Sequence, residues 1–447
     1  MIERLVLLTL LMIATVGCDA ANEATPPYPN ELAEHVEWLR SNATPIMHIA
    51  PGSADFADLQ PVGRAIGDAR IVLLGEQSHG DGTVFLMKAR LIEYLHRELG
   101  FDVLAFESGL YDMDLAWRRI VVGEAAGTAM RRAVFSIWTG SQEFKPTIDY
   151  VERAARSGNP LELAGFDLQF TGTASRDSLV TDLEGLLARN ASLLPADPGW
   201  QEFRAMLSGA TSGSWYTTLP SEPERTRFGE MLAKVQADVL VLAQQGSDTK
   251  APFWVEVLAS TADQVANFVD YAANGGQLSR PFSVRRDTRM ARNLLWLAND
   301  PFRNRKIIVW AATYHIVRDI EAIRLENPSS GFSYEGVVTM GEVAAEQLGN
   351  DMYMIGFTAF EGIVGPWFET PRPLSRASMP SLEWMFNEAD LADAFLDFRD
   401  LNSGGEWLRS NNIARPLGYV NMIAVWPRHL DAVIYNREMR PSTPAIP

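Results

Sequence analysis

Short runs of consecutive apolar residues recur along the chain, and each is bounded by glycine or polar residues. A continuous run of this length, rich in Val and Ile, is typical of a strand buried on both faces of a sheet. The first such run, Ile71 to Leu74, stops at Gly75. On this pattern we predict strands at 70–74, 102–106, 161–164, 306–310 and 352–356, with two later additions at 422–425 and 432–434.

Between these runs the apolar residues recur at three- and four-residue spacing, which indicates amphipathic helices. The spacing predicts helices over about 30–40, 83–99 and 143–156, and another from Tyr111 onward. Strands that alternate with helices favour an α/β fold, with a largely parallel central sheet flanked by helices.

One long block, 174–297, shows helical periodicity and almost no strand signal. We interpret this block as a helical subdomain inserted between the third and the fourth predicted strand. The α/β catalytic core is therefore expected in two parts, 31–173 and 298–447.

The N-terminus resembles that of a bacterial lipoprotein. An apolar run from Leu5 to Val16 has the length of a signal-peptide core and is too short to span a membrane. The tetrad 15–18 resembles a lipobox, in which the chain is cut before the cysteine and a diacylglycerol is attached to its sulfur. We expect a signal peptide at 1–17, a lipidated Cys18 as membrane anchor, and a flexible tether over 18–30. The alternative is an ordinary secretory signal with an incidental cysteine.

This reading places the protein in the cell envelope, facing the periplasm or the cell exterior. Cys18 is the one cysteine, so the chain forms no internal disulfide and its core offers no thiol nucleophile. Lys and Arg total 39 against 56 Asp and Glu, which gives a net charge of −17. Like charges repel a phosphate backbone, so we expect no nucleic-acid partner.

Polar residues follow the first four predicted strands. Glu76 and His79 come after the first strand, Glu107 after the second, Asp167 after the third and His315 after the fourth. Ligands of parallel sheets bind outside the carboxyl ends of the strands. We therefore expect these side chains to converge along one edge of the sheet.

The chemistry that they indicate is attack by water. The chain lacks the Gly-x-Ser-x-Gly elbow, the His-Glu-x-x-His zinc motif and the phosphate-binding loop. Without an obvious nucleophile, direct attack by water is the simplest hydrolytic scheme, with a histidine or carboxylate taking the proton. Glu76 is close enough in sequence to hold His79 in one tautomer. The alternatives are a structural histidine for His79 and helix capping for the carboxylates.

These residues also resemble a known family. The segment Gly75-Glu76-Gln77-Ser78-His79-Gly80 at the end of the first strand is similar to the Gly-Glu-x-x-His-Gly motif of the erythromycin-esterase family. The matching pieces further along are Glu107, Gly165-Phe166-Asp167, Arg286-Asp287-x-x-Met290-x-x-Asn293 and His315. The resemblance covers roughly residues 45 to 440.

The resemblance implies hydrolysis of a small-molecule ester, which in the family is a macrolide lactone. It implies that His79 is the general base, that Glu76 and Glu107 position it or the substrate, and that His315 holds the reacting group. The family usually has an arginine where this chain has Lys88, which keeps the charge but loses the planar fork. We expect Lys88, Asp167 and Arg286 to bind the substrate, with Arg286 or Arg90 supplying the guanidinium.

We expect no cofactor, but one alternative involves a metal. Fold relatives of this family bind haem or use a metal, and Glu76, His79, Glu107 and His315 are acceptable zinc or manganese ligands. A metal-dependent hydrolase on the same fold therefore stays open, as does a haem- or metal-binding envelope lipoprotein without turnover. A third alternative is an inactive scaffold.

Overall fold

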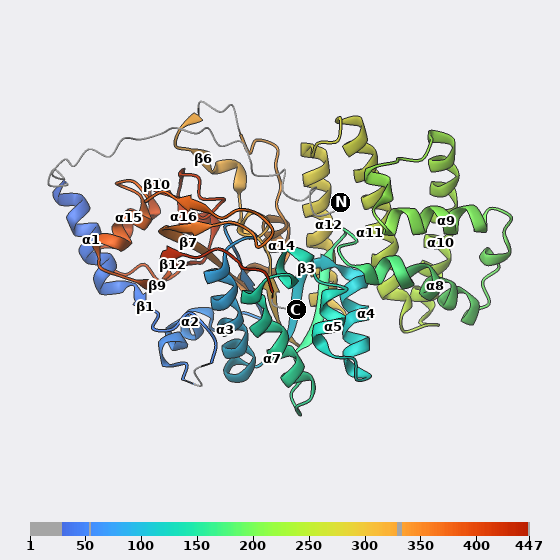
Figure 1. The fold of residues 1–447 in the computed structure, drawn as a ribbon, viewed down its shortest axis with the longest axis horizontal. Helices are drawn as coiled ribbons and strands as arrows, with labels where there is room; N and C mark the ends of the chain where they lie inside the picture. The colour runs from blue at the N-terminus through green and yellow to red at the C-terminus, as the bar shows by residue number, and fades with distance from the viewer. Residues whose placement is uncertain (1–28, 53–54, 329–332, 446–447) are drawn as a thin grey trace.

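The computed structural model describes residues 29–52, 55–328 and 333–445. In this part of the chain a central sheet has nine strands, in the order β1-β9-β12-β7-β2-β5-β3-β4, with β8 paired to β7 (Figure 1). Their bounds are β1 Thr44–Pro45, β2 Ile71–Leu74, β3 Phe101–Gly109, β4 Glu162–Asp167, β5 Lys306–Trp310, β7 Met352–Val364, β8 Arg372–Leu374, β9 Asp393–Asp397 and β12 Ala432–Met439.

The predicted fold class is confirmed: this is an α/β protein with a largely parallel sheet. Strands β12, β7, β2, β5, β3 and β4 run parallel to one another, whereas β1, β8 and β9 form the antiparallel pairs of the sheet. The apolar runs at 70–74, 102–106, 161–164, 306–310, 352–356 and 432–434 all lie in the parallel part.

The run at 422–425 was expected in this sheet, and that expectation is wrong. It forms β11 (Met422–Ala424) of a separate antiparallel sheet, together with β6 (Arg324–Leu325) and β10 (Asn412–Ala414). Its middle residue, Ile423, is partly exposed, so this strand is not buried on both faces as the central ones are.

Helices cover both faces of the central sheet. Alternate residues of β2 face different sides: Val72 and Leu74 belong to one buried apolar cluster, and Ile71 and Leu73 to the other. The helices outside the segment between β4 and β5 are α1 Asn30–Asn42, α2 Gln60–Ile66, α3 Gly82–Leu99, α4 Leu110–Val121, α5 Ala126–Arg131, α6 Ser136–Thr139, α7 Lys145–Ala155, α13 Thr313–Ile316, α14 Met340–Leu348, α15 Leu382–Glu388 and α16 Trp426–His429.

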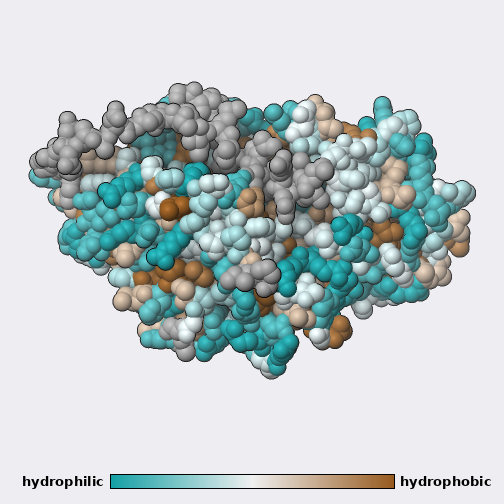
Figure 2. Space-filling model, in the orientation of Figure 1, coloured by the Kyte–Doolittle hydropathy of each residue, from teal (hydrophilic) through white to brown (hydrophobic). Residues whose placement is uncertain are grey.

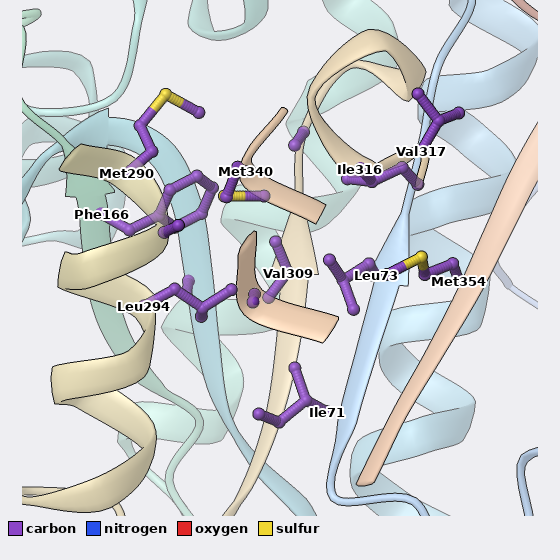
Figure 3. Packing of buried hydrophobic residues seen from close by; sticks show 14 of the residues in the cluster. Ile71, Leu73, Phe166, Met290, Leu294, Val309, Ile316, Val317, Met340 and Met354 are labelled. Carbon is purple, nitrogen blue, oxygen red and sulfur yellow. The ribbon is translucent and has the colours of Figure 1, made fainter. Parts of the chain in front are cut away.

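Between β4 and β5 the chain is helical. It forms α8 Thr173–Arg189, α9 Trp200–Thr211, α10 Glu222–Gln245, α11 Ala251–Ala273 and α12 Arg280–Asn299. The first four lie at one end of the molecule, drawn in green to olive-yellow in Figure 1. Helix α12 joins them to the sheet, because its Met290 and Leu294 pack on the side chains of Phe166 and Val309 (Figure 3). The division of the chain into domains stays a prediction.

The face shown in Figure 2 is largely hydrophilic, with small separate apolar areas. Among the residues that the structure describes, no helix combines the length and the apolar character that crossing a membrane requires. The predicted signal peptide, Cys18 and nearly all of the predicted tether lie outside the described residues.

Candidate active site

The loop that follows β2 carries a fully buried carboxylate, Glu76, which accepts hydrogen bonds from three side chains. Its Oε1 lies 2.8 Å from Nδ1 of His79 and accepts from the indole nitrogen of Trp138, also at 2.8 Å. Its Oε2 accepts from Nζ of Lys88 at 2.6 Å. Because the carboxylate oxygen accepts, the proton of the neutral imidazole is on Nδ1, and Nε2 keeps its lone pair.

His79 is the exposed member of this group. Its side chain is 24% exposed, whereas that of Glu76 is fully buried. The indole of Trp138 packs edge-on against the imidazole, with ring centroids 5.5 Å apart. The ring is thus held by a hydrogen bond at one nitrogen and by packing on one side.

Lys88, from α3, is fully buried beneath Glu76. Its ammonium also donates to the carbonyl of Ala311 at 3.1 Å and lies 4.4 Å from the ring centroid of Trp310. Burial lowers the pKa of Lys88, and the adjacent charge of Glu76 opposes that shift. The described contacts of Lys88 are therefore with buried groups of the protein, and its contact with a substrate stays a prediction.

A second group surrounds Arg286 of α12. Its Nη2 donates to Glu107 of β3 at 2.8 Å and to Asp167 at the end of β4 at 2.7 Å. Asp167 also accepts a hydrogen bond from the backbone of Gln169, so it has a local capping contact as well. Arg90 cannot serve as the guanidinium of this site, because it is buried elsewhere against Asp58.

His315, from α13, completes this second group. Its Nδ1 lies 2.7 Å from Asp287, and its Nε2 lies 3.2 Å from Glu107 and 3.3 Å from Nη1 of Arg286. Burial alone would lower the pKa of His315, but Asp287 and Glu107 outweigh it and raise the pKa to about 10. Burial alone would raise the pKa of Glu107, but the charges of His315 and Arg286 hold it well below its usual value.

A single backbone segment, 311–313, connects the two groups. The carbonyl of Ala311 accepts from Lys88, the amide of Ala312 donates to Glu107 at 2.9 Å, and the amide of Thr313 donates to the carbonyl of Glu76 at 2.8 Å. The strands beneath, β2, β5, β3 and β4, are neighbours in this order and parallel. The expected convergence at one sheet edge is therefore present.

Two residues that contact the site, Trp138 and Asp287, were not predicted to have a role in it. Trp138 comes from the short helix α6, and nothing in its local sequence marks it. Asp287 lies beside Arg286 in the family-like segment. A carboxylate on the same helix as the apolar residues Met290 and Leu294 was the sequence feature that could have indicated it. Both residues orient a histidine and come from helices, not from strand ends.

The carboxylates that were considered as metal ligands are engaged by protein donors. Both oxygens of Glu76 and both of Glu107 already accept hydrogen bonds from protein donors, several of them cationic. Within the described ranges, no group of three or more His, Cys, Asp or Glu residues is arranged to hold a metal ion. The arrangement instead offers a polarised, partly exposed imidazole beside a buried network of charges.

The site has a histidine that a carboxylate orients, at the carboxyl edge of a parallel sheet. This arrangement suits hydrolysis by general-base catalysis. The chain belongs to the erythromycin esterase family, whose model matches residues 96–439. Family membership supports a hydrolase. The matched range contains Glu107, Arg286 and His315, and it begins after His79.

Two curated relatives agree with this membership. A putative hydrolase, YbfO, from Bacillus subtilis (strain 168) is 24% identical over 441 residues, with 91% of each chain covered. Erythromycin esterase type II from Escherichia coli is 22% identical over 340 residues, with 73% of this chain and 77% of that protein covered.

Solved structures share the fold. A Bacillus cereus protein superposes with a TM-score of 0.75 at 19% identity, covering 94% of this chain and all (100%) of that chain. A protein described as a succinoglycan biosynthesis protein superposes with a TM-score of 0.71 at 18% identity, covering 93% of this chain and 99% of that chain. A mutant of the erythromycin esterase EreC in its open conformation superposes with a TM-score of 0.65 at 17% identity, covering 89% of this chain and 98% of that chain.

Proposed function

We propose that the protein hydrolyses a carboxylic ester, with Nε2 of His79 as the general base that activates water. The observation that carries this proposal is the pairing of Nδ1 of His79 with the buried Glu76, which leaves Nε2 as the acceptor on a partly exposed ring. Lys88 donates to the other oxygen of Glu76 and Trp138 to the same oxygen as His79, so three side chains orient the carboxylate before substrate arrives.

In the proposed reaction, Nε2 of His79 takes a proton from water as the water oxygen attacks the ester carbonyl carbon. The carbonyl π electrons move to its oxygen and form a tetrahedral oxyanion. When the oxyanion collapses, the bond to the alkoxy group breaks, and the protonated His79 returns the proton to the departing oxygen. The products are an acid and an alcohol, and the base is regenerated.

Arg286 and His315 are proposed to stabilise the oxyanion. Arg286 is the partly exposed cation of the second group, with 19% of its side chain accessible, and His315 carries a positive charge because its pKa is raised to about 10. Glu107, Asp167 and Asp287 hold these two cations in place. Preorganised charge of this kind acts without reorganisation during the reaction.

We propose a macrolide lactone as the substrate to test first. The support is the family itself and the Escherichia coli relative, which is named an erythromycin esterase type II. We also propose that the protein acts in the cell envelope, anchored through Cys18, on the lipobox-like tetrad of its N-terminus.

The test is incubation of the purified chain, started at Tyr28, with erythromycin, and mass spectrometry for the addition of one water. His79→Ala is expected to abolish turnover. His48→Ala is the matched control, because His48 is an exposed histidine outside both groups. Turnover that persists in His79→Ala would contradict the proposed base.

Two further arms separate the alternatives. A sample treated with EDTA is expected to keep its activity, and loss of activity there would favour the metal-dependent alternative. If erythromycin is unchanged, a panel of simple esters follows. Hydrolysis of another ester would keep the mechanism and remove the macrolide, whereas no hydrolysis of any ester would overturn the proposal.

A further inference from the structure

Beyond β12, residues 440–445 cross the outside of the molecule, and we call them the C-terminal strap. The family match ends at residue 439, so the strap lies outside it. Apart from Pro441 and Ser442, its residues are exposed. It is therefore held by hydrogen bonds rather than by burial in the core.

One half of the strap pairs with the loop that carries His79. The amide of Ser442 donates to the carbonyl of Gly80 at 2.7 Å, and the amide of Arg440 donates to Oγ1 of Thr83 at 3.0 Å. Gly82 fits here because it has no side chain: a Cβ at this position would lie 2.5 Å from the carbonyl oxygen of Pro441.

The other half pairs with the segment that follows Trp138. The amide of Ala445 donates to the carbonyl of Gly140, and the amide of Gln142 donates to the carbonyl of Thr443, both at 2.8 Å. Both the amide and the hydroxyl of Thr443 donate to the carboxylate of Glu143, at 2.8 Å and 2.6 Å.

The strap therefore joins two segments whose side chains meet at Glu76. One segment carries His79, and the other carries Trp138, which donates to Glu76 and packs on the imidazole. Within the described part of the chain, no hydrogen bond of the strap reaches His79, Glu76 or Trp138 themselves. Its influence on the site has to pass through the backbone of the two segments.

From this geometry we infer that the C-terminal strap is a positioning element for the reaction, which holds the His79 loop in register with Trp138. The inference rests on the proposed function of His79. A group that is misplaced by about 1 Å can lose roughly a hundredfold in rate, so a loosened loop lowers turnover without removing any catalytic residue. Substrate affinity is expected to stay unchanged, because the strap's hydrogen bonds go to Gly80, Thr83 and residues 140–143 and not to the proposed substrate-binding residues.

The test is Ser442→Pro, which removes the amide that donates to Gly80, with Ser442→Ala as the matched control. The control keeps the amide, and Oγ of Ser442 has no hydrogen-bond partner among the described residues. In Ser442→Pro, hydrogen–deuterium exchange is expected to rise in the peptides covering 78–83 and 140–143 and to stay unchanged in β5. The kcat is expected to fall about tenfold while KM stays within about twofold.

Thr443→Val is a milder second variant, since it removes only the hydroxyl contact with Glu143 at an exposed position; Thr443→Ser restores that hydroxyl. We expect a smaller change in exchange and kcat for the valine variant and wild-type behaviour for the serine variant. Unchanged exchange in both Ser442→Pro and Thr443→Val would overturn the inference, as would faster exchange with unchanged kcat. If the wild-type protein hydrolyses no ester, the proposed function fails, but the exchange measurement still decides whether the strap holds the loop.

Discussion

The buried contact between Lys88 and Glu76 places two charges where neither is exposed to water. Removing one partner of such a pair leaves the other charge buried and uncompensated, which costs about 3–5 kcal/mol. We expect Lys88→Met to lower the free energy of unfolding by about this amount, measured by urea denaturation. Lys234→Met is the control: its 3.2 Å ion pair with Asp197 is largely exposed, so the change should stay below about 1 kcal/mol. Equal effects of the two substitutions would contradict this view of the Lys88 contact.

His315 makes the stability of the protein depend on pH. Its pKa is raised from 6.5 to about 10 in the folded chain. A raised pKa means that the folded state binds the proton more tightly, so this contribution is complete below about pH 6.5 and is lost as the pH rises through about 10. We expect the difference in unfolding free energy between wild type and His315→Gln to shrink over this interval, in urea titrations near pH 6, 8 and 10. If the unfolding free energies of the two proteins change with pH in parallel, His315 does not titrate as described.

At the scale of single residues, the sequence predicted those site members that end strands. Glu76, Glu107 and Asp167 lie within three residues of the ends of apolar runs, so topology alone places them at one sheet edge. Trp138 and Asp287 could not be found in this way, because their positions depend on how α6 and α12 pack against the sheet. The pairing of the C-terminal strap could not be predicted either, because the hydrogen bonds of an exposed segment leave no periodic pattern in the sequence.

At the scale of elements, α13 and α14 approach more closely than side chains allow. A Cβ on Gly341 of α14 would lie 1.9 Å from the carbonyl oxygen of Ile316, next to His315. Because a backbone atom cannot yield as a flexible side chain does, we expect Gly341→Ala to destabilise the protein by about 1–3 kcal/mol. Displacement of α14 would also move Met340, whose amide donates to Asp287, the partner of His315. We therefore expect the activity of Gly341→Ala to be lower too.

Gly229 of α10 provides the matched control for this substitution. It is exposed, and nothing lies within 4 Å of the Cβ that an alanine would add. Alanine is the better helix former, so Gly229→Ala should stabilise the protein by about 0.5–1 kcal/mol. Thermal unfolding of both variants tests the pair. A Gly341→Ala variant as stable as the wild type would mean that α14 can move away from α13 without a loss of stability.

Elements differed in how far the sequence predicted them. The strands of the parallel core were predictable, because burial on both faces leaves an uninterrupted apolar run. The antiparallel strands β1, β8 and β9 were not, since they are short, partly exposed and, in β9, bounded by Asp393 and Asp397. The apolar run of β11 was found but assigned to the wrong sheet, because a run carries no information about its partner.

At the scale of the whole molecule, the proposed membrane attachment rests on the lipobox-like tetrad that ends in Cys18, which lies outside the described residues. They contain no helix fit to span a membrane, and the visible face is largely hydrophilic. A chain with a net charge of −17 is also repelled by anionic lipid. The proposed attachment is through the sulfur of Cys18, and it can be tested by substitution of that residue.

We expect Cys18→Ser to release the protein from the membrane without changing its activity, because Cys18 lies outside the two groups of the candidate site and the first described helix begins only at Asn30. The measurement is partition between detergent and aqueous phases, together with metabolic labelling by a fatty acid, in a bacterial host. Asp19→Asn is the control, since it alters the neighbouring charge and keeps the sulfur. Detergent partition that persists in Cys18→Ser would remove the lipid anchor, whereas loss of partition in both variants would assign the effect to processing of the leader rather than to the cysteine.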